Sequence, residues 1–351
     1  MRPKKLATWR KSWHYACNTL ATPLLGQPSD APIWRVLFFF KKFKLFQRLK
    51  YKKPALTYDE QLSLLESRGL IVPDRQLAVR WLSRVSYYRF SAYLYPYRVP
   101  DSDHYKPGTT FDAIANIYNF DRQLRLKLLD AIQRIEVWLR TAVTYELAHR
   151  CGPFGHLRRT AFRRGFDHKL FRKTLRDEHQ RSKEPFVQHY REKYTGENHL
   201  PIWMATEVLT FGTLSVLYSA LPLSSKRNIA ATVGLKDTVL SNWLQSIAYM
   251  RNLCAHHSRV WNRHLSISPK LAKGIASRGI EPNKLYAGLV AIQYLLSQIA
   301  PNSTWTQRVA DFFRENPTID FRQMGFPPDW QTRLPFGQPS LPEVKSPSTH
   351  V

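Results

Sequence analysis

Apolar residues recur every three or four positions along most of this chain. The clearest case begins after Thr110, a candidate N-cap, and stops before the helix-breaking Cys151-Gly-Pro-Phe-Gly155. Such spacing places side chains on one face of an α-helix, so we predict one long helix over about 110–149. Arg122 and Arg125 are expected on its other faces. The predicted buried stripe consists of Leu124, Leu128, Ile132, Ile135, Leu139 and Val143.

Capping residues and apolar faces predict the other helices. Thr57 followed by Glu60 has the form of a capping box, and Asp74 is a candidate N-cap for a second helix. The segment 202–218 is apolar nearly all round, which predicts one buried helix in which Glu207 needs a partner. A loop is expected around Pro185. Further helices are predicted over about 167–182, 237–256, 285–299 and 304–314.

These patterns indicate an all-α fold, a multi-helix bundle with a helical N-terminal extension. Residues 1–53 are predicted to form a disordered basic-aromatic arm, and residues 331–351 a disordered tail rich in Pro and Ser. Residues 54–330 are expected to form the helical domain, with a possible sub-boundary near 150–200. The arm could stack on single-stranded nucleic acid or lie on a membrane surface, or it could be a solvated tail.

Charge narrows the choice of partner. The chain carries 53 Lys and Arg against 26 Asp and Glu, a formal net charge of +27 over 351 residues. Residues 1–53 hold 13 of these cations and one Asp, so +15 remains on the rest. A basic body of this kind attracts polyanions, which makes nucleic acid the first partner to consider. No apolar run approaches the ~20 residues of a membrane span, so no stable membrane insertion is expected.

Cysteine usage adds a cellular context. The three cysteines, Cys17, Cys151 and Cys254, are odd in number and widely scattered, so they form neither a disulfide framework nor a zinc ligand set. We therefore expect a soluble, cytoplasmic protein.

The densest positive patch outside the arm lies between residues 158 and 176. Eight Lys and Arg stand there against one acidic residue, Asp167. The patch is either a track for RNA phosphates or a solvated charged face. Its candidate RNA-binding residues are Arg158, Arg159, Arg163, Arg164, Lys169, Arg172, Lys173 and Arg176.

The most chemically loaded stretch runs from Tyr249 to Arg263. Asn252 and His256 are i,i+4 neighbours on a helix, and the long side chain of Arg251 can reach the same side. An imidazole exchanges protons near neutral pH and a guanidinium holds phosphate, so the cluster suits acid–base cleavage of a phosphodiester. A helix end with a solvated Arg and a packed His explains the same spacing. Three further residues suited to RNA follow, namely Arg259, Trp261 and Arg263.

A metal site is the rival chemistry at these residues. Adjacent histidines, His256 and His257, cannot easily face one ion from a helix, and no nearby carboxylate or Cys pair completes a ligand set. We therefore expect neither a metal nor another cofactor.

Several blocks, taken in order, give the chain a family resemblance. It resembles the Abi-like proteins of the AbiD/AbiF type, bacterial abortive-infection proteins in the HEPN superfamily. The resemblance covers roughly residues 53–330. The blocks include Val85-Ser-Tyr-Tyr-Arg-Phe90, Phe120-Asp-Arg-Gln-Leu-Arg125, Ile135-Glu-Val-Trp-Leu-Arg-Thr141, Ile202-Trp-Met-Ala-Thr-Glu-Val-Leu-Thr-Phe-Gly212, Met250-Arg-Asn-Leu-Cys-Ala-His256 and Met324-Gly-Phe-Pro327.

The resemblance implies a HEPN-like bundle and specific roles for the motif R-N-x-x-x-H. His256 would be the general acid or base, Arg251 would stabilise the charged phosphorane, and Asn252 would hold the geometry. The site would be composite, shared by a homodimer, because the chain has one clear motif copy; Arg140 with His149 is too widely spaced to be a second. His257 and Glu207 are supporting candidates at this site.

Two functions remain open from the sequence. The first is an antiphage effector, a metal-independent endoribonuclease that attacks through the RNA 2′-hydroxyl and arrests growth. The alternative is a non-catalytic RNA-binding protein of a toxin–antitoxin-like or non-coding-RNA-controlled system.

Overall fold

The structure is a computed structural model that describes residues 53–195, 199–271, 279–333 and 336. The predicted arm and most of the predicted C-terminal tail lie outside these residues. All the described helices belong to one compact unit that begins at Leu56. Twelve α-helices make up its framework, and the described residues form no strand beyond two isolated bridges, which confirms the all-α fold class.

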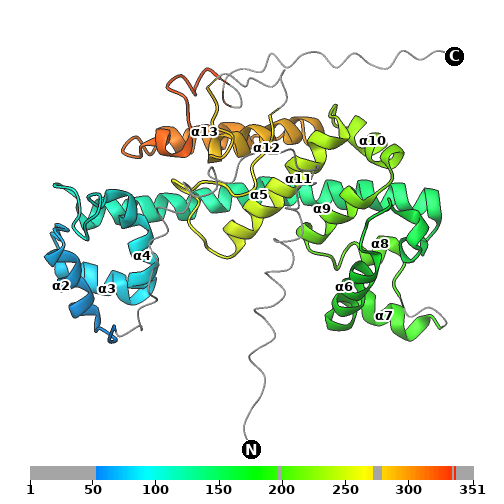
Figure 1. The fold of residues 1–351 in the computed structure, drawn as a ribbon, viewed down its shortest axis with the longest axis horizontal. Coiled ribbons are helices and arrows are strands. Elements are labelled where there is room, and N and C mark those ends of the chain that lie inside the picture. The colour runs from blue at the N-terminus through cyan, green and yellow to red at the C-terminus, as the bar shows by residue number, and fades with distance from the viewer. Residues whose placement is uncertain (1–52, 196–198, 272–278, 334–335, 337–351) are drawn as a thin grey trace, which may run out of the picture. The chain divides into compact units, whose positions relative to one another are not determined.

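The long helix α5 (Phe111–Cys151) is the element against which most of the others pack (Figure 1). It begins as predicted, because the Thr110 side chain accepts a hydrogen bond from the N–H of Ala113 (3.2 Å). All six residues of the predicted stripe are fully buried. Arg125, which lies outside the predicted stripe, is buried as well.

The helices before and after α5 are short by comparison. Those before it are α2 (Tyr58–Ser67), α3 (Arg75–Val85) and α4 (Tyr87–Leu94), with the 3-10 turn η2 (Tyr95–Tyr97). Those after it are η3 (Gly155–Leu157), η4 (Arg159–Ala161), α6 (His168–Arg181), α7 (Pro185–Lys193), α8 (Ile202–Ala205), α9 (Phe211–Ala220), α10 (Leu223–Ala231), α11 (Asp237–Ala255), α12 (Leu285–Ile299), α13 (Trp305–Arg314) and η5 (Phe321–Met324).

The two predicted N-terminal caps are confirmed. Thr57 and Glu60 form a reciprocal capping box on α2, and the carboxylate of Asp74 accepts from the N–H of Leu77 (2.9 Å) at the start of α3. The loop expected around Pro185 is instead α7, which places Pro185 in its first turn, where a missing N–H costs nothing.

The single helix predicted over 202–218 is two helices. α8 ends at Ala205, and α9 restarts after Thr210, whose hydroxyl accepts from the N–H of Thr213 (3.2 Å). Because the segment is apolar throughout, its hydrophobic pattern did not reveal this break. The Thr210 cap and Arg140, which is distant in sequence, stabilise the break. The break matters because it lies beside the candidate site.

Candidate active site

The motif residues lie at the C-terminal end of α11. This helix is anchored by Trp243, which is fully buried and donates its indole N–H to the carbonyl of Lys270 (2.9 Å). Arg251 and Asn252 occupy the last turn, half-buried, and His256 is the exposed C-cap. The N–H of His256 donates to the carbonyl of Asn252 (3.0 Å), so the chain is still helical between them. The three residues thus lie within about one and a half turns at the end of α11.

The helix stops through a Schellman turn with an unusual residue in it. The N–H of Ser258 donates to the carbonyl of Leu253 (2.9 Å), and that of His257 donates to Cys254 (3.1 Å). His257 fills the left-handed position, with φ of 55°, that glycine normally takes. A residue with a Cβ there costs about 1 kcal/mol. The turn directs the chain away from the helix axis directly after His256.

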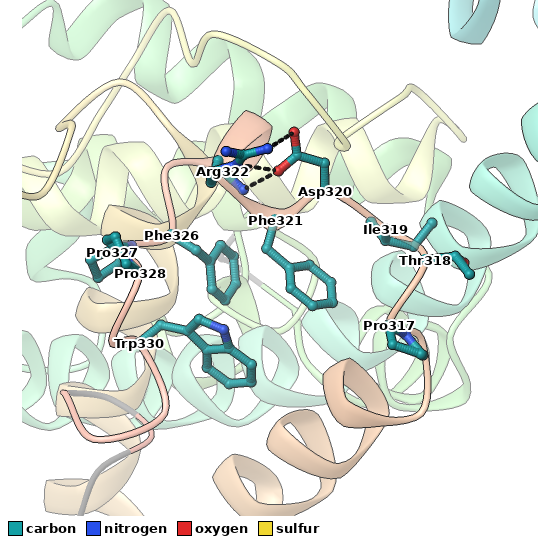
Figure 2. Close-up of a pocket in the computed structure, with 10 residues that line it drawn as sticks. All are labelled: Pro317, Thr318, Ile319, Asp320, Phe321, Arg322, Phe326, Pro327, Pro328 and Trp330. Carbon is teal, nitrogen blue, oxygen red and sulfur yellow. Dashed lines mark hydrogen bonds and ion pairs between the residues drawn. The ribbon is translucent and has the colours of Figure 1, made fainter. Parts of the chain in front are cut away.

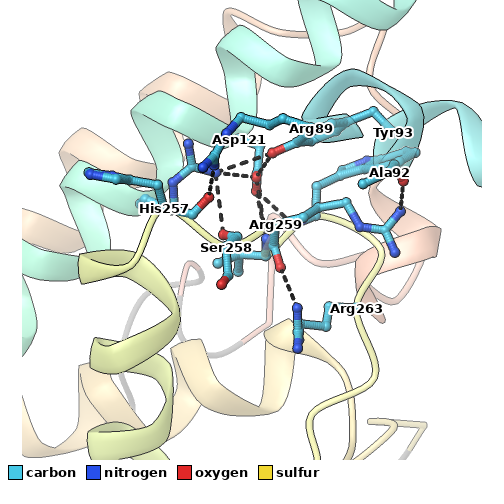
Figure 3. A network of polar contacts seen from close by, with 11 residues as sticks. Arg89, Ala92, Tyr93, Asp121, His257, Ser258, Arg259 and Arg263 are labelled. Atoms are coloured by element: carbon cyan, nitrogen blue, oxygen red, sulfur yellow. Dashed lines mark hydrogen bonds and ion pairs between the residues drawn. The ribbon is translucent and has the colours of Figure 1, made fainter. Parts of the chain in front are cut away.

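A buried carboxylate fixes the chain that follows this turn (Figure 3). Asp121 of α5 is fully buried, and its Oδ1 accepts from the backbone N–H groups of Val260 (3.1 Å) and Trp261 (2.7 Å). Its Oδ2 accepts from the hydroxyl of Tyr93 (2.5 Å) and from the guanidinium of Arg125. Four donors satisfy one carboxylate, so the segment after His256 is held against both α4 and α5.

Burial raises the pKa of Asp121, and the charge of Arg125 and the hydrogen bonds to the carboxylate oppose that rise. Burial opposes the charge on Arg125, but the carboxylate of Asp121 outweighs it and raises the pKa of Arg125. Burial beside Asp121 also raises the pKa of Tyr93, so its hydroxyl stays protonated and donates. The sequence did contain a signal for this pair, because Asp121 and Arg125 are i,i+4 beside the apolar stripe.

A second link joins the turn to α4. The guanidinium of Arg89 donates to the backbone carbonyl of His257, and Arg125 lies 3.4 Å from the carbonyl of Ser258 (Figure 3). Two cations therefore bind the exposed carbonyls of the turn, which places the C-cap residue His256 on a well-supported backbone.

The side chain of Arg251 faces α5. Glu136 accepts from Arg140 one turn away (2.8 Å), and its other oxygen lies 4.0 Å from Nε of Arg251. Glu136 is 18% exposed and Arg251 37%, so the shared carboxylate is more shielded than the motif arginine. The pairing with Arg251 was not predicted, since it joins residues far apart in sequence.

Arg140 also explains the break between α8 and α9. Its guanidinium donates to the carbonyls of Thr206 and Leu209 at the break, and the Thr206 carbonyl also accepts from the N–H of Leu209 (3.3 Å). Glu207 lies at the same break, with its carboxylate 3.9 Å from Nε of Arg140 and a side chain that is 55% exposed. Glu207 is therefore exposed beside the cluster, whereas the sequence predicted it inside a buried helix.

The residues after the motif serve packing more than the sequence suggested. Trp261 is 1% exposed, with rings of Tyr93 and Tyr97 stacked 6.4 Å away, so its predicted use by RNA was wrong for this structure. Arg259 donates to the carbonyl of Ala92 (2.7 Å), and Arg263 donates to the carbonyl of Arg259 (3.3 Å). Burial lowers the pKa of Arg259. Both arginines are half-buried and brace the segment.

The basic residues between 158 and 176 separate into two groups. Arg158, Arg163 and Arg172 bond within the chain, to the carbonyls of Cys151 and Ser219 and the ring of His199 respectively, although Arg158 and Arg163 remain exposed. Arg159 donates to the carbonyl of Arg163, and Arg164 is exposed. An exposed cationic face is left on α6, formed by Lys169, Lys173 and Arg176 at i, i+4 and i+7.

His149 does not join Arg140 in a second motif. Nine residues of α5 separate them, about 13 Å along a helix axis. The ring of His149 packs on Tyr145 at 3.9 Å between centroids. No group of three or more His, Cys, Asp or Glu side chains among the described residues is arranged to hold a metal ion. None of the helices described here combines the length and the apolar character that a membrane span needs.

The fold and the site define an all-α protein with a cationic cluster at a braced helix end. A family model described as Abi-like protein matches residues 80–262, just over half of the 351-residue chain. The chain therefore belongs to the Abi-like protein family, as the sequence blocks indicated, and this membership supports a role in abortive infection. No curated protein and no solved structure matches the chain significantly.

Proposed function

We propose that this Abi-like protein is an endoribonuclease of the HEPN type that cleaves RNA without a metal ion and acts in phage defence. The observation that carries the proposal is the grouping of Arg251, Asn252 and His256 at one exposed helix end. Arg251 has one ion pair in the described part of the chain, the 4.0 Å approach to Glu136, so most of its donors remain available to a phosphate.

The proposed reaction needs proton transfer and charge stabilisation. The RNA 2′-hydroxyl loses its proton and attacks the adjacent phosphorus, the bond from phosphorus to the 5′-oxygen breaks, and that oxygen gains a proton. The products end in a 2′,3′-cyclic phosphate and a 5′-hydroxyl. His256 is assigned the proton transfer and Arg251 the added charge on the phosphorane oxygens. Asn252 is assigned to holding the reacting groups in place.

A single motif supplies one such imidazole, whereas the reaction moves protons at two oxygens on opposite sides of phosphorus. We therefore include in the proposal a homodimer in which two copies of the motif face one RNA strand. The surface beside the site offers apolar contact area, since Val137, next to Glu136, is 57% exposed and Trp203 of α8 is 48% exposed.

A second candidate function, non-catalytic RNA binding, is favoured by a different observation. The cationic face of Lys169, Lys173 and Arg176 lies on α6, away in sequence from the motif, and its charges are exposed. Such a face binds phosphates without any chemistry. Binding through it would survive loss of the imidazole.

The test compares purified wild-type protein with His256→Ala and Arg251→Ala on single-stranded RNA in EDTA. Matched controls are His189→Ala and Arg227→Ala, because both side chains are exposed and lie outside the motif. The wild type and both controls should produce fragments with 2′,3′-cyclic phosphate ends, and the two motif variants should lose at least 100-fold in rate.

Each result separates the two functions. If His256→Ala cleaves as fast as the wild type over a broad RNA panel, the nuclease proposal fails. If no variant cleaves but all bind RNA equally, the non-catalytic function is supported instead.

A further inference from the structure

A groove of about 440 Å³ opens among residues 317–330, near the end of the described chain (Figure 2). Three aromatic rings line it, those of Phe321, Phe326 and Trp330, with ring centroids 5.6 to 5.9 Å apart. Phe326 and Trp330 are largely buried, so these rings form a fixed floor. Proline rings at Pro317 and Pro327 complete the walls.

The groove also carries polar groups suited to a peptide. Trp330, one of the lining residues, carries an indole N–H that can donate a hydrogen bond. At the rim, Asp320 pairs with Arg322 (2.9 Å), whose side chain is 81% exposed. The hydrogen bond from Arg322 lowers the pKa of Asp320, so the rim offers both signs of charge. Grooves lined by aromatic rings are how polyproline II segments are bound.

The chain itself supplies such a segment. Residues 338–345 read Gln-Pro-Ser-Leu-Pro-Glu-Val-Lys, in which Pro339 and Pro342 have the PxxP spacing of one polyproline II turn. Glu343 and Lys345 follow, with charges complementary to Arg322 and Asp320. These residues lie outside the part of the chain that the structure describes.

The last described residue, Phe336, lies against the groove. Phe336 stacks on Phe326 (6.1 Å) and meets Trp330 edge to face (5.3 Å), both of them groove residues. Only Gly337 and Gln338 separate Phe336 from Pro339. At about 3.1 Å per residue, nine residues from Gly337 span about 28 Å, ample to cross the groove.

We propose that the groove lined by Phe321, Phe326 and Trp330 binds the chain's own segment 338–345 as a polyproline II strand. Because the segment belongs to the same chain as the groove, weak contacts are enough to hold it there. A short flexible linker gives an effective concentration of about 1 mM, so an intrinsic Kd of about 0.1 mM fills the groove about nine times in ten.

The proposal also places the strand near the motif. The side-chain amide of Asn262 donates to Gln323 (2.9 Å), and Gln323 directly follows the rim residue Arg322. The bound segment therefore lies one contact away from the chain that leaves His256.

The test uses the full chain with a fluorescein-labelled peptide of residues 337–351. In Pro339→Ala/Pro342→Ala protein the groove is left open, so the wild-type peptide should bind at least tenfold more tightly than to wild-type protein, as measured by anisotropy. Adding Trp330→Phe to that protein removes the indole donor and should weaken the peptide at least fivefold. The matched control is Tyr88→Phe, which removes a hydroxyl from an exposed ring outside the groove. Circular dichroism confirms folding in each variant.

Several results would overturn the proposal. These are no binding of the peptide to either protein, equal binding to both, or equal binding of a peptide with the same composition in scrambled order. Light scattering adds a further arm: a doubled mass that Pro339→Ala/Pro342→Ala abolishes would show the segment crossing to a second copy instead of its own chain. None of these readouts depends on RNA cleavage.

Discussion

The carboxylate of Asp121 accepts a hydrogen bond from the backbone N–H of Trp261 at 2.7 Å, across 140 positions of sequence. This contact ties the first third of the long helix α5 to the segment that follows the motif. It works through backbone groups, so the identity of the side chains after His256 matters less than the path of the chain. The position of the motif therefore depends on a residue that makes no contact with it.

Asp121→Asn tests this tie. The change keeps the shape of the side chain but leaves the buried cation of Arg125 without its counter-charge, which should lower the free energy of unfolding by about 3 kcal/mol. Urea denaturation measures it. The control, Asp130→Asn, breaks more exposed pairs with Arg134 and Arg308 and should cost less than about 1 kcal/mol. Equal losses in the two variants would mean that the buried pair contributes no more than a surface one.

His257→Gly tests the left-handed turn. Glycine adopts a φ of 55° without strain, so the free energy of unfolding should rise by about 0.5–1 kcal/mol. Under the proposed function RNA cleavage should persist, because the backbone carbonyl that Arg89 binds is retained. A β-branched residue, as in His257→Val, should instead destabilise the protein. Loss of cleavage in a stable His257→Gly protein would give the His257 side chain a direct part in the reaction.

His156 gives stability a defined pH dependence. Burial, with His199 and His168 nearby, lowers the pKa of His156 to about 4 from an ordinary 6.5. Between these values the unfolded chain binds a proton that the folded chain does not, so stability is present above pH 6.5 and falls as the pH drops.

The fall amounts to about 3 kcal/mol by pH 4, at 1.4 kcal/mol for each pH unit. Urea unfolding at pH 7 and pH 4.5 should show this loss in the wild type. His156→Gln removes the titrating group, so its loss over the same range should be smaller by about 2 kcal/mol. Parallel curves for the two proteins would contradict the assignment.

What the sequence could predict was local. The starts of three helices could be predicted from their N-caps, because a cap depends only on neighbouring residues. These N-caps are Thr57, Asp74 and Thr110. The order Arg251, Asn252, His256 predicted one helix end for the same reason. The approach of Glu136 to Arg251 could not be predicted, since it depends on how α5 packs against α11.

The break between α8 and α9 shows the other limit. A segment that is apolar throughout is compatible with one helix or with two. Tertiary contacts determine which of the two forms. Arg140 supplies the deciding contact by donating to carbonyls at the break. Burial of Trp261 was likewise hidden, because an aromatic ring among cations fits both a stacking surface and a core.

Arg140→Ala should therefore act on the break as well as on Glu136. Removing charged donors from two half-buried carbonyls should lower the free energy of unfolding by about 2 kcal/mol. Hydrogen exchange should accelerate at residues 206–210 and at the last turn of α11. The control Arg134→Ala loses an exposed ion pair with Asp130 and should leave exchange there unchanged. Slow exchange at 206–210 in Arg140→Ala would show that Thr210 alone holds the break.

The cationic face of α6 should determine how RNA binding depends on salt. Replacing Lys169, Lys173 and Arg176 together by Ala should weaken RNA binding and reduce the slope of log K against log salt by about 2, because each lost phosphate contact removes about 0.7 for a single strand.

The control replaces three exposed cations elsewhere, Arg80, Arg84 and Arg122, and removes the same charge from the chain. Both triple variants are made in a His256→Ala protein, so that cleavage does not interfere. Filter binding at several salt concentrations then measures RNA binding alone. Net charge acting at a distance would lower both slopes alike, whereas a phosphate track on α6 lowers only the first. A slope that stays unchanged in the α6 variant would assign these three residues to a solvated face.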